Sequence, residues 1–345
     1  MKITRSDRIR GSLLGGAMGD ALGYPVEFMH RSGILQRYGE KGITAYEYDR
    51  LSGKALISDD TQMTLFTAEG MLTAAAAKEN QPLYRYVAAA YQNWLITQEQ
   101  NVPSPASDSR LMLVPELYSR RAPGNTCLSA LYEARLRPLK EDPLSEACNH
   151  SKGCGGIMRV APLGLCLKNP EAAVMEGARM AAITHGHSLG YLSAAMLTGL
   201  LNRILYAEGE NLEQKILDTL DMICALFSDD SHLEQLRSLT ELAIALAKND
   251  DSDAVNVPLL GKGWVGEETL AISFYCALRY EQDFSAGLIA SVNHDGDSDS
   301  TGAVTGNILG ALRGYDALEE KWKQNLELKE VLLETADALS QISGR

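Results

Sequence analysis

Residues 10–23 have the sequence RGSLLGGAMGDALG, in which a glycine recurs at every fourth position. Residues 302–310 repeat this spacing near the other end of the chain. The glycines concerned are Gly11, Gly15, Gly19 and Gly23 in the first stripe and Gly302, Gly306 and Gly310 in the second. Because a glycine destabilises a helix by about 1 kcal/mol relative to alanine, each stripe needs an offsetting gain. The stripes predict two helices with closely packed backbones. Tight packing alone would explain them, but acidic residues flank both helices, so the packing is also expected to bring those residues together.

Helical patterns dominate the rest of the chain. In segments rich in Ala, Leu, Met, Glu and Gln, apolar residues recur at three- and four-residue spacings. The alternating pattern of a strand is almost absent, and Ile43–Tyr48 is its best example. The predicted helices are Leu65–Ala77, Leu83–Leu95, Ala172–Ile183, Leu189–Ala207, Leu212–Phe227, Leu233–Ala247, Glu267–Tyr280 and Lys329–Ile342. The predicted loops are Asn101–Ser109, Arg121–Asn125, Arg137–Pro143, Asn149–Gly156 and Asn249–Pro258. Because no loop resembles a linker between independent domains, we predict an all-α fold, with one compact multi-helix domain spanning residues 1–345.

The composition excludes several classes of protein. The 345 residues include 45 acidic and 32 basic side chains, a formal charge of −13, and no block of Lys or Arg. Nucleic-acid binding through bulk charge is therefore not expected, although a local site can still bind a small anion. The longest apolar stretch, Tyr191–Ala207, contains Asn202 and Arg203 and falls short of a membrane span, so we expect a buried core helix there. The six cysteines show no CxxC spacing, which predicts reduced thiols in a cytoplasmic protein.

A first acidic cluster, Ser58-Asp59-Asp60-Thr61-Gln62, directly precedes an apolar helical run. Ser58 or Asp59 is suited to cap this helix, and Gln62 follows Asp59 at the spacing of a capping box. A well-capped helix therefore explains the cluster without a metal ion. Two similar segments are predicted to have structural roles only: Ser228-Asp229-Asp230 as a helix cap, and Asp250–Asp253 as a solvated turn.

A second acidic cluster, HDGDSDSTG at residues 294–302, places carboxylates at three alternate positions, Asp295, Asp297 and Asp299. Such crowding of like charges is unfavourable unless cations or water offset it. An EF-hand calcium loop is excluded, because the sixth position counted from Asp295 is Ser300 rather than glycine. The carboxylates and hydroxyl that remain are hard oxygen ligands, which suit Mg²⁺ or Mn²⁺ rather than zinc.

Three further features are weaker signals on their own. Glu27 lies just after the first glycine stripe. Residues 151–159 (SKGCGGIMR) form a glycine-rich turn that exposes backbone N–H groups, but the turn matches neither a P-loop nor a dinucleotide fingerprint, and a plain tight turn also explains it. His185 and His187 flank Gly186 between two helical segments. Hydrogen bonds to a phosphate or ribose suit these histidines better than metal binding, and a structural role at the helix junction is the alternative.

Together the motifs resemble the ADP-ribosylglycohydrolase family, which includes dinitrogenase reductase-activating glycohydrolase and the ADP-ribosyl-arginine and ADP-ribosyl-serine hydrolases. The resemblance covers nearly the whole chain. It rests on seven segments in order: RGSLLGGAMGDALGYPVEF, SDDTQMT, RRAPGNTCLSAL, SKGCGGIMRVAPLGL, THGHSLGY, GKGWVGEETLAI and HDGDSDSTGAVTGNILGA. The resemblance implies an all-α fold with two adjacent divalent cations, Mg²⁺ or Mn²⁺, at its centre. It also implies a metal-dependent hydrolase that cleaves the glycosidic bond between ADP-ribose and a modified protein side chain or small molecule.

The resemblance also implies a role for individual residues at the matching positions. The implied metal ligands are Ser58, Asp59 and Asp60 from one side and Asp297, Asp299 and Ser300 from the other. The family often has Thr where this chain has Ser58 and Ser300, and a hydroxyl remains. The implied substrate contacts outside the glycine-rich loop are Asp59, His185 and Trp264. Those within the loop, which resembles the family's pyrophosphate and ribose loop, are Gly153, Cys154, Gly155, Gly156 and Met158. The implied catalytic residues are Glu27 and Asp60.

The chemistry of this bond sets the expected mechanism. When a side-chain N or O leaves the distal ribose C1″, oxocarbenium-like positive charge develops on the ribose. Two cations can hold the ribose hydroxyls and a water molecule. Asp60 or Glu27 can then accept the proton of that water.

A catalytically silent ADP-ribose-binding or structural protein, like the lens J-crystallins that resemble this family, is one alternative. A metal-dependent nucleotide phosphohydrolase is another. The retained oxygen donors at the ligand positions favour an enzyme, and the acceptor stays open among arginine, serine, another residue and a small molecule.

Overall fold

The computed structural model describes residues 3–79, 81–103, 109–136 and 141–343. Over these residues the chain forms sixteen α-helices and five short 3₁₀-helices, and extended segments meet only at isolated bridges such as the one between Tyr48 and Ala55. The predicted all-α fold is therefore confirmed. Ile43–Tyr48, the best strand candidate, forms no strand, because only its last residue has a bridging partner.

The eight helices predicted from apolar spacing all occur, mostly with ends within a few residues of those predicted. The largest shift is at the third helix, which begins at Asp59 rather than Leu65, so that the first acidic cluster forms its first turn. The α-helices are α1 (Arg5–Gly23), α2 (Arg31–Tyr38), α3 (Asp59–Ala76), α4 (Leu83–Glu99), α5 (Asn125–Arg135), α6 (Ala161–Cys166), α7 (Pro170–Ala182), α8 (Ser188–Tyr206), α9 (Leu212–Leu226), α10 (Leu233–Ala247), α11 (Asp253–Leu260), α12 (Gly266–Arg279), α13 (Phe284–Val292), α14 (Ser298–Arg313), α15 (Glu320–Lys323) and α16 (Lys329–Ile342).

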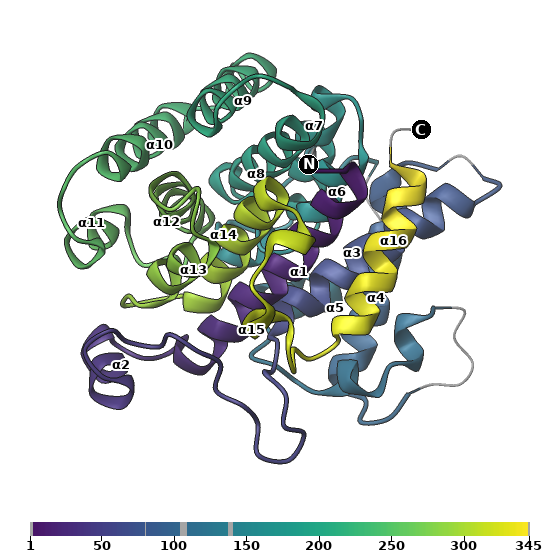
Figure 1. Cartoon of the computed structure of the whole chain (residues 1–345). Helices are drawn as coiled ribbons and strands as arrows, with labels where there is room; N and C mark the ends of the chain where they lie inside the picture. Colours follow the sequence, from purple (N-terminus) through teal and green to yellow (C-terminus); the bar gives the residue numbers. More distant parts are fainter. Residues whose placement is uncertain (1–2, 80, 104–108, 137–140, 344–345) are drawn as a thin grey trace.

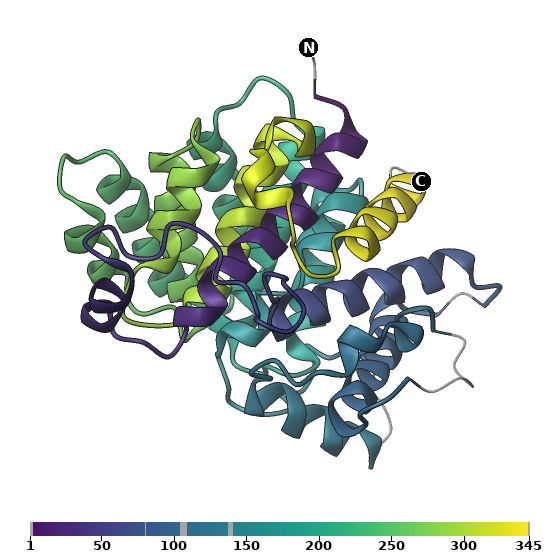
Figure 2. The same ribbon diagram turned by 60° about the horizontal axis from the view of Figure 1, so that its bottom comes forward.

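Helices α1 and α14 lie against each other in the middle of the molecule and run antiparallel, although they come from opposite ends of the chain (Figures 1 and 2). Their glycine stripes face each other, with Gly11 beside Gly310, Gly15 beside Gly306, and Gly19 beside Gly302. A Cβ atom on any of these glycines would overlap a backbone carbonyl of the other helix, so the two backbones can approach only because the side chains are absent. The predicted close packing of the two striped helices is confirmed.

Replacing Gly306 by alanine is expected to lower the free energy of unfolding by about 3 kcal/mol, the size of a severe overpacking change. The added methyl group would overlap the carbonyl of Gly15, which belongs to a helix backbone and cannot move aside. Gly33→Ala in α2 is the matched control, because a Cβ there comes no closer than 3.5 Å to Met29 Cε. Urea unfolding monitored by circular dichroism measures both variants, and equal stabilities of Gly306→Ala and wild type would contradict the packing argument.

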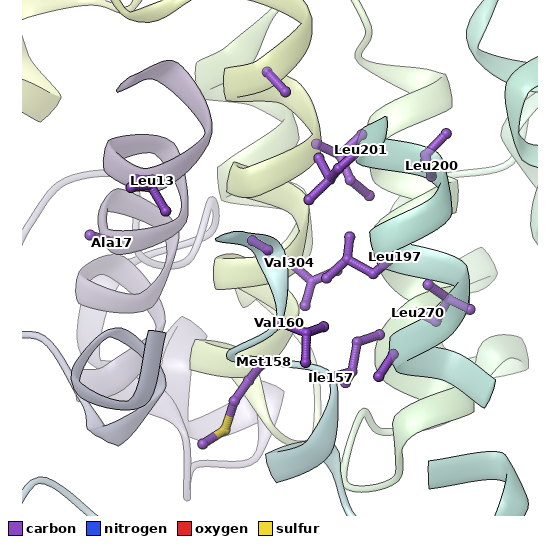
Figure 3. Close-up of a cluster of buried hydrophobic side chains, with 14 of the residues drawn as sticks. Leu13, Ala17, Ile157, Met158, Val160, Leu197, Leu200, Leu201, Leu270 and Val304 are labelled. Atoms are coloured by element: carbon purple, nitrogen blue, oxygen red, sulfur yellow. The ribbon is translucent and has the colours of Figure 1, made fainter. Parts of the chain in front are cut away.

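Side chains from α1, α8, α12 and α14 meet in a hydrophobic cluster, represented by Leu13, Leu197, Leu270 and Val304 (Figure 3). Ile157 and Val160, which follow the glycine-rich turn, point into the same cluster, whereas the Met158 side chain extends to the other side, and all three are buried. The segment after the turn is therefore anchored in the hydrophobic core, and the turn itself lies next to α8 and α12.

Helix α8 contains most of the long apolar stretch and is largely buried, as predicted. Its two strongly polar side chains find partners: Asn202 Nδ2 donates to the Leu167 carbonyl at 2.5 Å, and Arg203 Nη2 donates to the Asp218 carbonyl at 3.2 Å. In the part of the chain that the structure describes, no helix has both the length and the apolar character needed to cross a bilayer.

One predicted loop is wrong. Asn249–Pro258 contains the start of α11, which runs from Asp253 to Leu260. Asp253 occupies the first turn, where a carboxylate is favourable, and it accepts hydrogen bonds from the hydroxyls of Tyr275 (2.5 Å) and Tyr280 (2.7 Å). These tertiary contacts stabilise a short helix that its own sequence, with Pro258 inside it, does not indicate. Of the other predicted loops, residues 104–108 and 137–140 lie outside the described residues.

Candidate metal centre

The antiparallel pairing of α1 with α14 places the end of one helix beside the beginning of the other. At Gly23, the last residue of α1, a Cβ would overlap the backbone of Ser298, the first residue of α14. A single 3₁₀-turn, Tyr24–Val26, then leads to Glu27. One carboxylate oxygen from each of Glu27, Asp297 and Asp299 lies within 4.8 Å of the others, and all three residues are buried. The glycine stripes therefore bring together carboxylates that are about 270 residues apart in the sequence.

The first acidic cluster reaches the same place from α3. Ser58 caps this helix, because its hydroxyl accepts from the Asp60 backbone N–H at 3.2 Å, and Asp59 and Asp60 form the first turn. Both aspartates are buried, and the Ser58 hydroxyl lies beside the Asp299 carboxylate. Helices α3 and α14 thus direct their N-terminal ends, which favour negative charge, towards one cluster of carboxylates.

The acidic cluster, defined as Glu27, Asp59, Asp60, Asp297 and Asp299, has no basic partner among the described residues. Two of its oxygens, Glu27 Oε2 and Asp60 Oδ2, are buried and accept no hydrogen bond from the described part of the chain. Leaving such atoms unpaired is expensive, and native proteins usually satisfy them with a partner. These two unpaired oxygens therefore indicate that the cluster is arranged to bind a cation.

Burial, and then the negative charge of Asp299, raises the pKa of Glu27 to about 11. The same two causes raise the pKa values of Asp59, Asp60 and Asp297 well above their usual range. The carboxylates thus repel one another strongly in the absence of positive charge, which a bound divalent cation would supply. The donors are hard oxygens from carboxylates and hydroxyls, so this set of residues fits Mg²⁺ or Mn²⁺.

The glycine-rich turn lies beside this cluster. Cys154 and Gly155 belong to a 3₁₀-turn that ends at Gly156, and the Cys154 thiol donates to Asp297 Oδ2 at 2.6 Å. The segment around Trp264 holds the turn in place, since the Cys154 N–H donates to the Trp264 carbonyl at 3.2 Å and Gly153 forms an isolated bridge with Val265. Ser300, also predicted as a ligand, is buried next to Asp299, whose Oδ1 accepts from the Ser300 N–H at 3.0 Å. The predicted loop and the predicted ligands are therefore neighbours in space.

The remaining predicted site residues lie around the turn, in different environments. His185 is buried, and a Cβ on either Gly153 or Gly155 would lie 3.3 Å from its Nε2. Met158 is buried, its carbonyl accepts from the Thr64 hydroxyl at 3.3 Å, and its N–H donates to the Cys154 carbonyl at 3.2 Å. His187 caps α8, because its Nδ1 accepts from the Leu189 N–H at 3.1 Å.

Trp264 lies at the outer edge of the acidic cluster, where it stacks on Phe28. The ring centroids are 5.8 Å apart and the planes differ by 21°. Phe28 directly follows Glu27 and is 74% exposed, and a Cβ on Gly263 would lie 3.3 Å from the Asp297 carbonyl. Two solvent-accessible aromatic rings therefore border the carboxylates, and Phe28 was not among the residues predicted from the sequence.

A cavity of about 760 Å³ adjoins the glycine-rich turn on the α5 side. Its wall is formed by α5 and by residues 143–151, and it extends to Ala182 and Ile183 at the end of α7. Ser151 lies at the junction of the cavity with the turn, where its hydroxyl is 3.2 Å from the Thr126 hydroxyl. The structure thus combines an acidic cluster, a glycine-rich turn and a cavity large enough for a nucleoside.

Asp20 is a site residue that the sequence did not reveal. It lies within α1, is completely buried, and accepts from the Ser58 N–H at 2.9 Å and the Thr61 N–H at 3.1 Å. The Thr61 hydroxyl donates to it as well. Burial, and then the charge of Asp299, raises the pKa of Asp20 to about 7. Asp20 therefore fixes the turn that carries Asp59 and Asp60. The one sequence feature that could have indicated this role is the presence of a carboxylate between the glycines of an apolar helix.

Asp20→Asn is expected to weaken Mn²⁺ binding by about 10- to 100-fold, the usual effect of losing a group that orients metal ligands. An amide presents N–H groups to backbone N–H donors, so it cannot hold Ser58 and Thr61 as the carboxylate does. Isothermal titration with Mn²⁺ measures the change. The control is Asp7→Asn at the far end of α1, which should bind Mn²⁺ like wild type, and unchanged binding by Asp20→Asn would remove its positioning role.

Three details of the acidic segments differ from prediction. Gln62 does not complete a capping box: its Oε1 accepts from Trp94 Nε1 at 3.1 Å, because the helix packs this side chain against α4. Asp295 stays outside the cluster and accepts from the Arg31 N–H at 2.5 Å at the start of α2. The second SDD segment does not cap α10 with a side chain; Asp230 instead accepts from the His232 N–H at 2.9 Å, just before that helix.

The chain thus combines an all-α fold with a buried cluster of oxygen donors, which could hold a metal ion, beside a glycine-rich turn. Residues 1–345 match the family model described as ADP-ribosylglycohydrolase, and the chain belongs to this family. It is 26% identical over 347 residues to the ADP-ribosyl-[dinitrogen reductase] glycohydrolase of Rhodospirillum rubrum, covering 98% of this chain and 97% of that protein. It is 29% identical over 204 residues to the human ADP-ribosylhydrolase ARH3, covering 51% of this chain and 54% of that protein.

The fold has been solved in a similar protein. A chain of a structure titled "ADP-ribosylglycohydrolase-related protein complex" superposes with a TM-score of 0.69 at 25% identity. The superposition covers 98% of this chain and 99% of the other. The arrangement of helices that brings the acidic cluster together is therefore shared with a solved member of this fold.

Proposed function

We propose that this protein is a metal-dependent hydrolase that releases ADP-ribose from a modified protein side chain or small molecule. The observation that carries the proposal is the buried cluster of Glu27, Asp297 and Asp299, which α1 and α14 assemble beside Asp59 and Asp60. Membership of the family and the named activities of its relatives support the same function.

Ser58, Asp59 and Asp60 on one side, and Asp297, Asp299 and Ser300 on the other, are the residues that would hold two divalent cations. When bound, such cations supply positive charge for the ribose hydroxyls and lower the pKa of a coordinated water. Asp60 and Glu27 each have a buried oxygen without a partner, so either can accept a proton from the attacking water. The water oxygen forms a bond to C1″ of the distal ribose as the bond from C1″ to the side-chain N or O breaks. The N or O leaves with the bonding electron pair and takes up the proton that Asp60 or Glu27 accepted from the water.

The glycine-rich turn and the neighbouring cavity would hold the rest of ADP-ribose. The N–H groups of Gly153 and Cys154 already donate to Ser151 Oγ and the Trp264 carbonyl, so those of Gly155 and Gly156 would be the backbone donors to a pyrophosphate. The cavity between α5 and residues 143–151 has room for the adenosine. Trp264 and Phe28 border the acidic cluster, and the acceptor would enter beside them. Bulk charge is not needed for this recognition, because the cations and backbone groups supply the positive potential locally.

The test is incubation with arginine-linked and serine-linked ADP-ribosyl peptides in Mg²⁺ or Mn²⁺, and again after the metal is removed with a chelator. We expect free ADP-ribose from at least one peptide, only when metal is present. Inorganic phosphate instead of ADP-ribose would favour a nucleotide phosphohydrolase. Tight binding of ADP-ribose without any turnover would favour a catalytically silent binding protein. Either of these outcomes would overturn the proposal.

A further inference from the structure

Arg159 is completely buried, yet among the described residues it has no carboxylate partner. Its guanidinium lies over the ring of Tyr91, 4.4 Å from the centroid, and its Nη2 donates to the Met180 carbonyl at 3.1 Å. The same nitrogen also donates to the Thr184 hydroxyl at 2.6 Å. An arginine has five N–H donors and no acceptor, so Thr184 Oγ1 must be the acceptor in this contact. The hydroxyl hydrogen of Thr184 is therefore directed elsewhere.

The nearest strong acceptor for that hydrogen is His185. Thr184 Oγ1 lies 2.8 Å from His185 Nδ1. Burial, and then the charge of Arg159, lowers the pKa of His185 to about 3, so the ring is neutral near neutral pH. A neutral imidazole has one protonated and one bare nitrogen. The hydrogen bond at Nδ1 determines whether the proton is on Nδ1 or on Nε2.

We infer that Thr184, oriented by Arg159, donates to His185 Nδ1 and so fixes the tautomer that carries its proton on Nε2. The Nε2 atom faces the glycine-rich turn, since a Cβ on Gly153 or on Gly155 would lie 3.3 Å from it. No residue of the described chain forms a hydrogen bond with Nε2. His185 therefore presents a free N–H donor beside the glycine-rich turn, and this donor suits a phosphate oxygen. Thr184 and Arg159 are positioning residues for that donor.

The competing arrangement is one in which His185 Nδ1 keeps its proton and donates to Thr184, while the Thr184 hydroxyl turns to the sulfur of Cys127, which lies close to it. Sulfur is a weaker acceptor than a bare imidazole nitrogen, so this arrangement is less favourable. It would also leave a lone pair on Nε2 pointing at the turn, where it would repel an anionic ligand.

The proposed function supplies the identity of the ligand, but the tautomer can be measured without it. Long-range ¹H–¹⁵N spectra of the ¹⁵N-labelled full chain distinguish protonated from bare imidazole nitrogens, and the His185 signals are identified by their loss in His185→Gln. We expect a bare Nδ1 and a protonated Nε2 in the wild-type protein. In Thr184→Val, which keeps the side-chain shape but lacks the hydroxyl, Nδ1 should become at least partly protonated. Thr184→Ser should restore the wild-type pattern.

Binding of free ADP-ribose, measured by calorimetry in the presence of Mg²⁺, is a second test of the role of Thr184. Thr184→Val should bind about 10-fold or more weakly, the loss expected for one hydrogen bond to a charged group, and Thr184→Ser should bind like wild type. A protonated Nδ1 in the wild-type protein would overturn the inference, and so would a Thr184→Val tautomer identical to wild type. If the predicted tautomers are found and no variant binds ADP-ribose, the inference holds and the proposed function fails.

Discussion

Replacing Asp299 by asparagine is expected to lower the rate of ADP-ribose release by about 10³-fold, comparable to the loss of one major electrostatic group in an active site. Asp299 contacts both halves of the site: it lies within 4.8 Å of Glu27 and Asp297, and the Ser58 hydroxyl lies beside it. An asparagine keeps the shape and the hydrogen bond from the Ser300 N–H but removes the charge that holds a cation. The fold should survive, because the substitution leaves the pairing of α1 with α14 unchanged.

The matched control for this prediction is Asp229→Asn in the second SDD segment. It changes net charge by the same amount, but Asp229 is exposed and remote from the acidic cluster in sequence. Release of ADP-ribose from a peptide substrate and far-ultraviolet circular dichroism are measured for both variants. We expect Asp229→Asn to match wild type in both measurements. An Asp299→Asn variant that retains more than a small fraction of the wild-type rate would show that the acidic cluster is not the catalytic site.

Addition of Mn²⁺ is expected to raise the free energy of unfolding of the wild-type protein by about 3 kcal/mol when the ion is at a hundredfold excess over its dissociation constant. The metal-free cluster contains buried carboxylates that repel one another, so a cation should bind the folded state far better than the unfolded chain. Asp299→Asn should be more stable than wild type without metal, because one source of repulsion is gone. The same variant should gain little from Mn²⁺.

Chemical unfolding in matched ionic strength separates this effect from screening of surface charge. Sodium chloride replaces MnCl₂ in the control titration, and Asp229→Asn should respond to Mn²⁺ like wild type. Equal stabilisation of wild type and Asp299→Asn by Mn²⁺ would mean that the ion binds elsewhere, for example at the exposed acidic turn around Asp251.

The glycine stripes and the long helices could be predicted because their signals are local. Apolar spacing fixes the buried face of a helix such as α9 or α16, and the stripe at Gly15 and Gly306 has few explanations other than a helix packed at close range. The pairing of the two striped helices also implied that Glu27 would meet Asp297 and Asp299. Glu27 follows the first glycine stripe, and the two aspartates precede the second. The shorter helices were harder to predict: α6 has six residues, too few for stability in isolation, and forms because the core buries it.

The roles of individual polar residues were predicted less well, because they depend on partners far away in the sequence. Asp20 orients the turn before α3 across 38 positions, and nothing near it in the sequence indicates that contact. Asp295 and Asp297 are two residues apart and have similar neighbours, yet one binds the start of α2 and the other joins the acidic cluster. Phe28 stacks on Trp264, which is far away in the sequence, so no local pattern indicates its place beside the acidic cluster.

We propose that carboxylates from α3, α14 and the turn after α1 surround divalent cations. Crystals of the protein soaked in Mn²⁺ test it directly, because manganese scatters anomalously and its position can be located without assumptions about the site. We predict anomalous peaks among Glu27, Asp60, Asp297 and Asp299, and none at these positions in crystals of Asp299→Asn. Fully ordered carboxylates with no peak among them, at a Mn²⁺ concentration that saturates other sites, would contradict the claim.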